Sequence, residues 1–209
     1  MNDTQKKSFD YAGNSYRVVI LKGLLIFKPV GAAIKANEAH SEPRRKIYEY
    51  GAEMKLPKQL EKEGIEPDVR AIFEKESVAL YSNSAIVIPV LKLTPKLRTN
   101  IFHAKSVGEL IIGYETIAKA LANELRGLKK IDSLGDRISR LLIAANDGSP
   151  RFYRELAFLR KRQGARVLIC RLDVDSLLMG DILGFKDQVV KAVLLNKKKS
   201  VINVLKSLL

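Results

Sequence analysis

Two short stretches contain residue types whose spacing could do chemistry. In the first, Gly113 and Tyr114 precede Glu115, and Lys119 follows Glu115 four residues later. If a helix starts here, its free N–H groups attract phosphate, and glycine allows a polyanion backbone to approach closely. Glu115 could then accept hydrogen bonds from a base edge, and Lys119, one turn on, could reach a phosphate or a base. Without a ligand, the same spacing predicts only an exposed ion pair worth about 0.3–0.5 kcal/mol.

The second stretch is the loop expected at residues 185–188, which contains Phe185 and Lys186. An aromatic side chain in a loop can stack on an unpaired base, and a neighbouring lysine can contact a phosphate. These two stretches are the candidate binding residues. A basic run at Lys197–Lys199 and a second one at Arg44–Lys46 are more typical of solvated loops.

Catalytic and metal-binding patterns are missing from the sequence. It contains no phosphate-binding P-loop, dinucleotide fingerprint, HExxH or GxSxG motif. Its two histidines, His40 and His103, fall in different predicted domains, and Asp173 with Asp175 fits a helix start better than a metal site. We therefore expect a non-enzymatic protein with no metal and no cofactor.

The net charge of +14 points to a polyanionic partner. The charge is uneven, because residues 1–100 carry a net charge of +5 and residues 101–209 carry +9. No apolar run is long enough to span a bilayer, so no membrane partner is expected. The single cysteine, Cys170, lies in an apolar run typical of a core strand and excludes an intrachain disulfide. An intracellular, cytoplasmic location fits this composition.

Elements with regular alternation must position the candidate residues. Thr94 and Pro95 form a good helix start. From there on, expected helices alternate with apolar extended stretches. The helices are expected at 95–106, 114–125 and from 150 to 164, and the extended stretches at 110–112, 140–145, 167–170 and 189–195. Further helices are expected before Gly184 and from Ser200. This alternation predicts an α/β fold, a three-layer α-β-α sandwich spanning residues 95–209. Residues 1–94 predict a small α+β domain of unknown role. Its expected elements are strands at 16–21 and 24–27, helices at 58–63 and 68–76, and a hairpin at 78–88.

Three stretches of the second half resemble, in order, the family of large-subunit ribosomal proteins seven-Ae and thirty-e, which bind kink-turn RNA. They are Lys105–Ala120, similar to the family's glycine-rich entry into its RNA-reading helix, Leu141–Pro150, and Leu178–Gly184, similar to its Leu-Gly-x-x-Leu-Gly. The bacterial branch is the most similar. Tyr114 stands where archaeal members have asparagine.

The resemblance implies a non-enzymatic RNA-binding protein of a ribosome or another ribonucleoprotein. Its ligand would be structured, kink-turn-like RNA, either ribosomal or another noncoding RNA, read by Gly113–Lys119 and the 185–188 loop. The N-terminal domain could contact other ribonucleoprotein subunits. The alternative is a protein-interaction or scaffold subunit that kept the fold and lost the RNA surface. Clustered lysines near Gly113 would favour RNA, and exposed apolar residues there would favour a scaffold.

Overall fold

The computed structural model describes residues 7–11, 14–21, 24–29, 54–82, 84–128 and 136–209, the first three segments by their backbone alone. The chain divides into two compact units, residues 1–43 and 44–209. The Arg44–Lys46 run and His40 lie outside the described residues.

The first unit contains one antiparallel sheet of three strands in the order β1-β2-β3. The strands are β1 (Lys7–Tyr11), β2 (Asn14–Leu21) and β3 (Leu24–Pro29). The two strands expected here are confirmed as β2 and β3, and their register pairs Val18 with Phe27. Strand β1 was not expected, because its sequence KSFDY lacks an apolar run.

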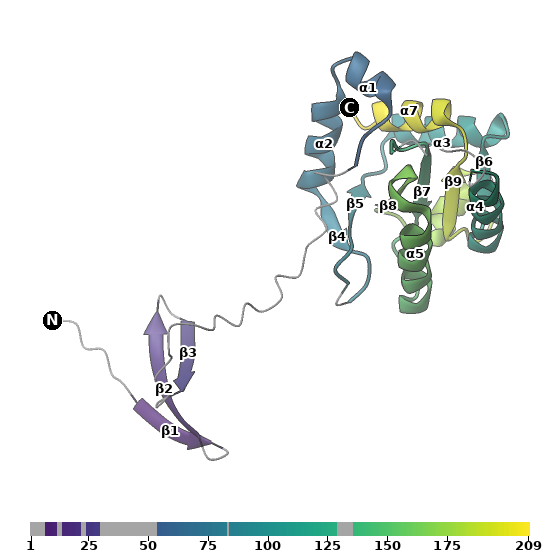
Figure 1. The fold of residues 1–209 in the computed structure, drawn as a ribbon. Coiled ribbons are helices and arrows are strands. Elements are labelled where there is room, and N and C mark those ends of the chain that lie inside the picture. Colours follow the sequence, from purple (N-terminus) through teal and green to yellow (C-terminus); the bar gives the residue numbers. More distant parts are fainter. Residues whose placement is uncertain (1–6, 12–13, 22–23, 30–53, 83, 129–135) are drawn as a thin grey trace. The chain divides into compact units, whose positions relative to one another are not determined.

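The second unit is built on a six-stranded mixed sheet in the order β4-β5-β8-β7-β9-β6 (Figure 1). Strands β5, β8 and β7 are parallel to one another, whereas β9 is antiparallel to both β7 and β6. The strands are β4 (Ser77–Ala79), β5 (Val87–Leu91), β6 (Leu110–Ile112), β7 (Arg140–Ala144), β8 (Val167–Leu172) and β9 (Ala192–Leu195).

Seven α-helices in the described residues pack against this sheet. Thr94, Ser149 and Asp175 cap α3, α5 and α6 by accepting hydrogen bonds from backbone N–H groups three residues on. The helices are α1 (Lys58–Lys62), α2 (Glu66–Lys75), α3 (Pro95–Ser106), α4 (Tyr114–Leu128), α5 (Pro150–Gln163), α6 (Ser176–Ile182) and α7 (Lys198–Lys206).

Two apolar layers, one on each face of the sheet, hold the unit together. Along β7, Leu141 and Ile143 face a layer that includes residues of α1, α2, α3, α6 and α7. Leu142 and Ala144 face a layer built with α4 and α5. This period-two alternation is what a sheet covered on both faces requires. The expected α/β sandwich with helices on both faces is therefore confirmed.

The boundary expected between residues 94 and 95 falls inside this unit and needs correction. Strand β5 pairs with β8, and Leu56 and Leu60 are fully buried in the same apolar layer as Cys170 and Leu205. Residues 54–82 and 84–94 therefore complete the sandwich rather than belong to a separate N-terminal domain. The physical reason is that the edge of β8 and the apolar faces of α3 and α7 need covering.

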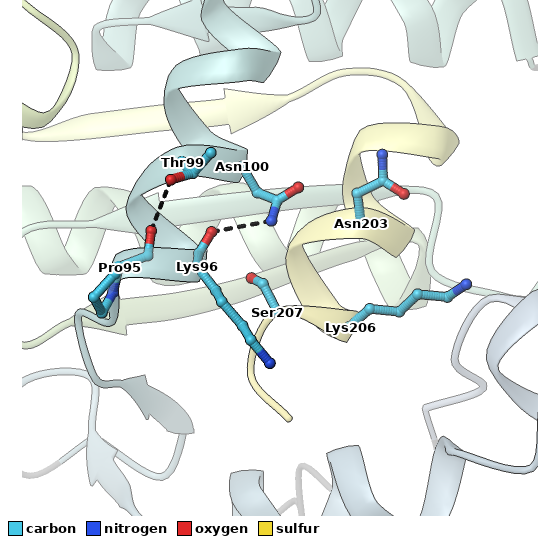
Figure 2. Close-up of a pocket in the computed structure, with 7 residues that line it drawn as sticks. All are labelled: Pro95, Lys96, Thr99, Asn100, Asn203, Lys206 and Ser207. Atoms are coloured by element: carbon cyan, nitrogen blue, oxygen red, sulfur yellow. Dashed lines mark hydrogen bonds between the residues drawn. The ribbon is translucent and has the colours of Figure 1, made fainter.

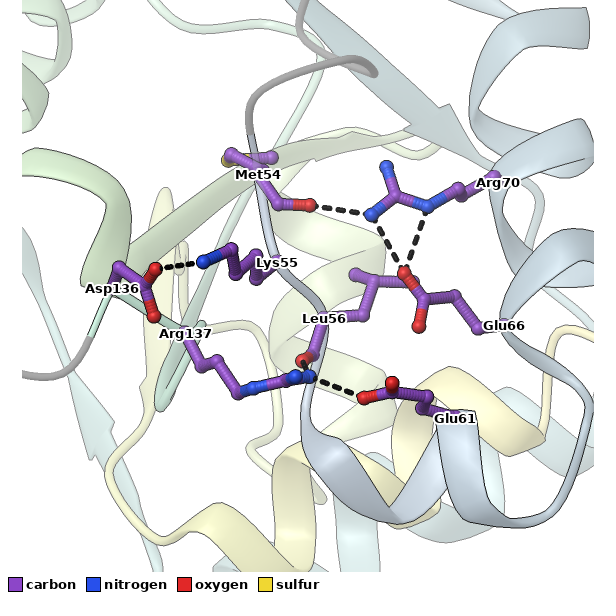
Figure 3. Close-up of polar contacts among 8 residues, drawn as sticks. All are labelled: Met54, Lys55, Leu56, Glu61, Glu66, Arg70, Asp136 and Arg137. Atoms are coloured by element: carbon purple, nitrogen blue, oxygen red, sulfur yellow. Dashed lines mark hydrogen bonds and ion pairs between the residues drawn. The ribbon is translucent and has the colours of Figure 1, made fainter.

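A polar network ties residues 54–56 to the segment that enters β7 (Figure 3). Arg137 donates a hydrogen bond to the Leu56 carbonyl and pairs with Glu61 at 2.8 Å, while Lys55 pairs with Asp136. Arg70 donates to the Met54 carbonyl at 2.6 Å. The contacts of Arg137 with Leu56 and of Asp136 with Lys55 each join residues 81 positions apart.

Several element ends differ from the expected ones by a few residues. Helix α4 continues beyond the expected end at residue 125 as far as Leu128. Residues 129–135 lie outside the described chain. Strand β9 starts at Ala192 rather than 189. Helix α7 starts at Lys198, so Ser200, the expected start, lies inside its first turn, where its hydroxyl donates to Glu109.

Candidate nucleic-acid interface

The candidate residues lie around one end of the sheet, which we call its C-terminal end. Strands β5, β6, β7 and β8 all point the same way, so their carboxyl ends meet there, and β9 starts there. Helices α4, α5 and α6 follow β6, β7 and β8 in the chain and therefore begin at this end. The C-terminal ends of parallel strands commonly hold ligand sites in open α/β sheets.

Gly113 forms the corner between β6 and α4. Its φ of +85° lies in the left-handed region that favours glycine, and its N–H donates to the Ala192 carbonyl at 3.0 Å. The first hydrogen bond of α4 runs from the Ile117 N–H to the Gly113 carbonyl. The N–H groups of residues 114–116 precede that bond, so this helix start has the free donors that a phosphate accepts.

Glu115 and Lys119 are both exposed, and among the described residues neither forms an ion pair. The simple interpretation of their spacing, an intrahelical salt bridge, is therefore not observed. Both side chains remain available to a partner.

Tyr114 turns away from these two residues toward α5. Its ring lies edge-on to Phe152, with 6.0 Å between centroids, and its hydroxyl donates to the Glu155 carbonyl at 3.4 Å. Burial against α5 raises the pKa of its hydroxyl, and the nearby Glu155 charge adds to that shift. The structure thus gives Tyr114 a packing role on the apolar face of α4.

The loop from residue 184 to 191 folds back over α6. Gly180 makes this possible, because a Cβ on Gly180 would lie 1.8 Å from the Gln188 carbonyl oxygen. The Val190 N–H donates to the Ser176 carbonyl at 2.8 Å and closes the loop. The first glycine of the Leu-Met-Gly-Asp-Ile-Leu-Gly stretch is therefore the residue that positions this loop beside the start of β9.

Phe185 lies in this loop but does not present a free ring. It is partly buried against the apolar layer, and the Lys105 Nζ lies 3.8 Å from its ring centroid while donating to the Leu183 carbonyl. Lys186 is exposed, as expected. In place of Phe185, the exposed apolar side chains of this region are Leu177 and Leu178 on α6 and Val189 in the loop.

The carboxylates at the C-terminal end of the sheet are used in backbone contacts. Asp147 accepts hydrogen bonds from the Ser176 N–H at 3.0 Å and hydroxyl at 2.6 Å, Asp175 caps α6, and Asp173 accepts from the Leu93 N–H at 2.8 Å. Burial would raise the pKa of Asp147, but the two Ser176 hydrogen bonds outweigh it, and the pKa is lowered.

The lysines around this end are not neutralised in the same way. In the part of the chain that the structure describes, Lys119, Lys186 and Lys191 are exposed and make no ion pair. Lys191 was not among the expected binding residues, because it fell inside the strand expected at 189–195, whereas the observed strand β9 begins one residue after it. The region therefore offers free cations and helix N–H groups while three of its carboxylates are already hydrogen-bonded.

A separate shallow groove of about 570 Å³ runs between α3 and α7 (Figure 2). Lys96, Asn100, Asn203 and Lys206 are among the residues that line it. The Asn100 amide donates to the Lys96 carbonyl of its own helix, and Lys206 pairs with Glu63. The residues that line this groove include no carboxylate, histidine or cysteine.

The described residues contain neither a candidate metal site nor a helix that could span a membrane. No group of three or more His, Cys, Asp or Glu side chains there could hold a metal ion. None of the described helices has both the length and the apolar character to cross a bilayer. His103 is exposed in the last turn of α3, and Cys170 is fully buried in β8, where burial raises the pKa of its thiol.

The chain matches no protein-family model and no curated protein. Among solved structures, it is similar to a protein of unknown function from Bacillus halodurans, with a TM-score of 0.41 and 13% sequence identity. That match covers 55% of this chain and 98% of the other.

Proposed function

We propose that the protein is a non-enzymatic RNA-binding protein that contacts structured, kink-turn-like RNA at the C-terminal end of its sheet. The observation that supports this most lies where α4 starts beside the end of the 184–191 loop, with the Gly113 N–H bonded to the Ala192 carbonyl. In the described part of the chain, Lys119 on α4 and Lys186 and Lys191 in the loop are exposed and make no ion pair. The net charge of +14 adds a long-range attraction for a polyanion. A ribosome or another ribonucleoprotein is the setting that the sequence resemblance implies.

Each group has a distinct part in this proposal. The N–H groups of residues 114–116 and the ammonium groups of Lys119, Lys186 and Lys191 contact phosphates. Glu115 accepts hydrogen bonds from a guanine edge, the contact that gives base preference. Tyr114 and Phe185 position their segments by packing on α5 and under Lys105.

The exposed apolar residues support a second candidate function, a protein-interaction or scaffold subunit. Leu177 is 48% exposed, Leu178 is 43% exposed, and Val189 is 55% exposed, all close to the same region. A protein partner would bury such residues, whereas an RNA partner would contact them only through an unpaired base. Glu115 and Asp187 are exposed in the same region, but the RNA proposal takes precedence because three exposed lysines there make no ion pair among the described residues and the net charge is +14.

The test is binding of the purified chain to a kink-turn RNA and to a plain duplex of equal length at several salt concentrations. The proposal expects tighter binding to the kink-turn, lost when Glu115→Ala and Lys119→Ala are combined. Lys119→Ala alone should reduce the salt dependence of log K by about one phosphate contact.

Lys75→Ala is the matched control, because Lys75 is an exposed helix lysine on α2, in the layer opposite α4. It should leave the kink-turn preference unchanged. Equal binding to both RNAs, with the same steep salt dependence in wild type and double variant, would reduce the interaction to non-specific charge. No RNA binding at all would move the assignment to the scaffold candidate.

A further inference from the structure

The outer face of α5 carries a continuous basic stripe with an aromatic residue in its middle, outside the region just described. The stripe is spaced at i, i+3, i+7, i+10 and i+11, which places all five residues within one third of the helix circumference. All five are exposed. The residues are Arg151, Arg154, Phe158, Lys161 and Arg162.

Positive charges outnumber negative ones along this stripe. Glu155 is the single acidic residue of α5, and it pairs with Arg151 at 3.1 Å. Among the described residues no ion pair neutralises Arg154, Lys161 or Arg162. A solvated helix face usually alternates charges of opposite sign at i, i+4 spacing, which this face does not.

Helix stability explains only half of the stripe. Lys161 and Arg162 lie in the last turn, where the helix dipole favours cations. Arg151 lies in the first turn, which contains no acidic residue and where the dipole disfavours cations, and Arg154 lies in the second turn, where the dipole gives it no stabilisation. Helix stabilisation by the dipole therefore does not account for Arg151 and Arg154, which indicates a role for them other than folding.

Phe158 points to the kind of anion. It is 61% exposed, the highest value among the large apolar side chains exposed in the described chain, and the Arg162 guanidinium lies 5.7 Å from its ring centroid. A cationic surface with an exposed aromatic ring is the arrangement that binds single-stranded nucleic acid, because every base can stack on the ring. A duplex keeps its bases stacked inside and would gain nothing from Phe158.

We infer that the outer face of α5 binds a single-stranded segment of RNA that flanks the structured element bound at the C-terminal end of the sheet. Helix α5 starts at that end and runs for about 21 Å away from it, so one RNA can follow both surfaces. The Tyr114 hydroxyl, bonded to the Glu155 carbonyl, links the start of α4 to this helix. The inference rests on the proposed function, and its test separates the two.

The test compares a kink-turn RNA alone with the same RNA carrying a short unpaired uridine tail, using the full chain. The tail should tighten wild-type binding, and Phe158→Ala should lose roughly fivefold or more of tailed-RNA affinity, the loss of one stacked base. Both Phe158→Ala and Arg154→Glu should leave binding of the untailed RNA unchanged. Arg154→Glu should also keep the melting temperature close to that of wild type, since Arg154 is an exposed residue without an ion pair among the described residues, so its loss of tail affinity cannot come from unfolding.

Lys58→Glu is the matched control, because Lys58 is an exposed cation in the first position of α1 in the opposite layer. It should not change the gain from the tail. A duplex extension that gives the same gain as the tail, or a gain that survives Phe158→Ala, would overturn the inference while the kink-turn binding stands. If wild type does not bind the untailed RNA, the proposed function fails. An α5-dependent affinity for a uridine oligomer alone would then still support this surface, and its absence would refute it.

Discussion

Replacing Leu60 by alanine should weaken the protection of Cys170, although the two residues lie on opposite sides of the expected boundary at residue 94. Both side chains are fully buried in one apolar layer, and Cys170 is the single thiol of the chain. A Leu→Ala change at a fully buried site costs about 2–5 kcal/mol. If residues 54–209 unfold as one unit, that cost should raise the equilibrium for exposing Cys170 by roughly 30-fold to several-thousand-fold.

The assay is the rate of Cys170 modification by a thiol reagent under native conditions, where each reaction requires opening of β8. Leu209→Ala is the matched control, because Leu209 is 49% exposed and its loss should change stability by no more than about 0.5 kcal/mol. A Leu60→Ala rate within twofold of wild type would refute the reasoning. Such a result would mean that the part of the sandwich between residues 54 and 94 unfolds separately from the rest.

Two other substitutions probe features that the sequence did not reveal. Glu124→Gln should lower the free energy of unfolding in urea by about 1–3 kcal/mol, because Glu124 pairs with Arg140 and with the buried Arg166. Burial would raise the pKa of Glu124, but Arg166 and Arg140 lower it overall. Wild type should therefore lose this stabilisation as pH falls from about 4 through the folded pKa. Parallel pH profiles of stability for wild type and Glu124→Gln would contradict this. Gly180→Ala should displace the Gln188 carbonyl and lower both the melting temperature and RNA affinity, and unchanged values of both would show that the loop is not held by this contact.

Helix starts and core strands could be predicted from the sequence because their signals are local. Thr94, Ser149 and Asp175 precede their helices and cap them as expected. The apolar run ending at Cys170 forms the fully buried strand β8. The sandwich follows from this alternation alone.

The domain boundary and part of the site depended on contacts distant in sequence. Nothing local to Leu56 indicates that Arg137, 81 residues later, bonds its carbonyl. The aromatic residue of the loop was expected to be free for stacking, but Lys105, 78 residues before Leu183, bonds that carbonyl and covers Phe185. The exposed Phe158 could be predicted only once the inward face of α5 was known.

Hydrogen–deuterium exchange of the full chain, with and without an untailed kink-turn RNA, would test the central claim most directly. The account predicts slower exchange at residues 114–116 and in the loop at 184–191, because these N–H groups and this loop lie against the RNA. Exchange in α1 and α2, which lie in the opposite layer from α4, should be unchanged. Protection elsewhere with none at the start of α4 would contradict the account.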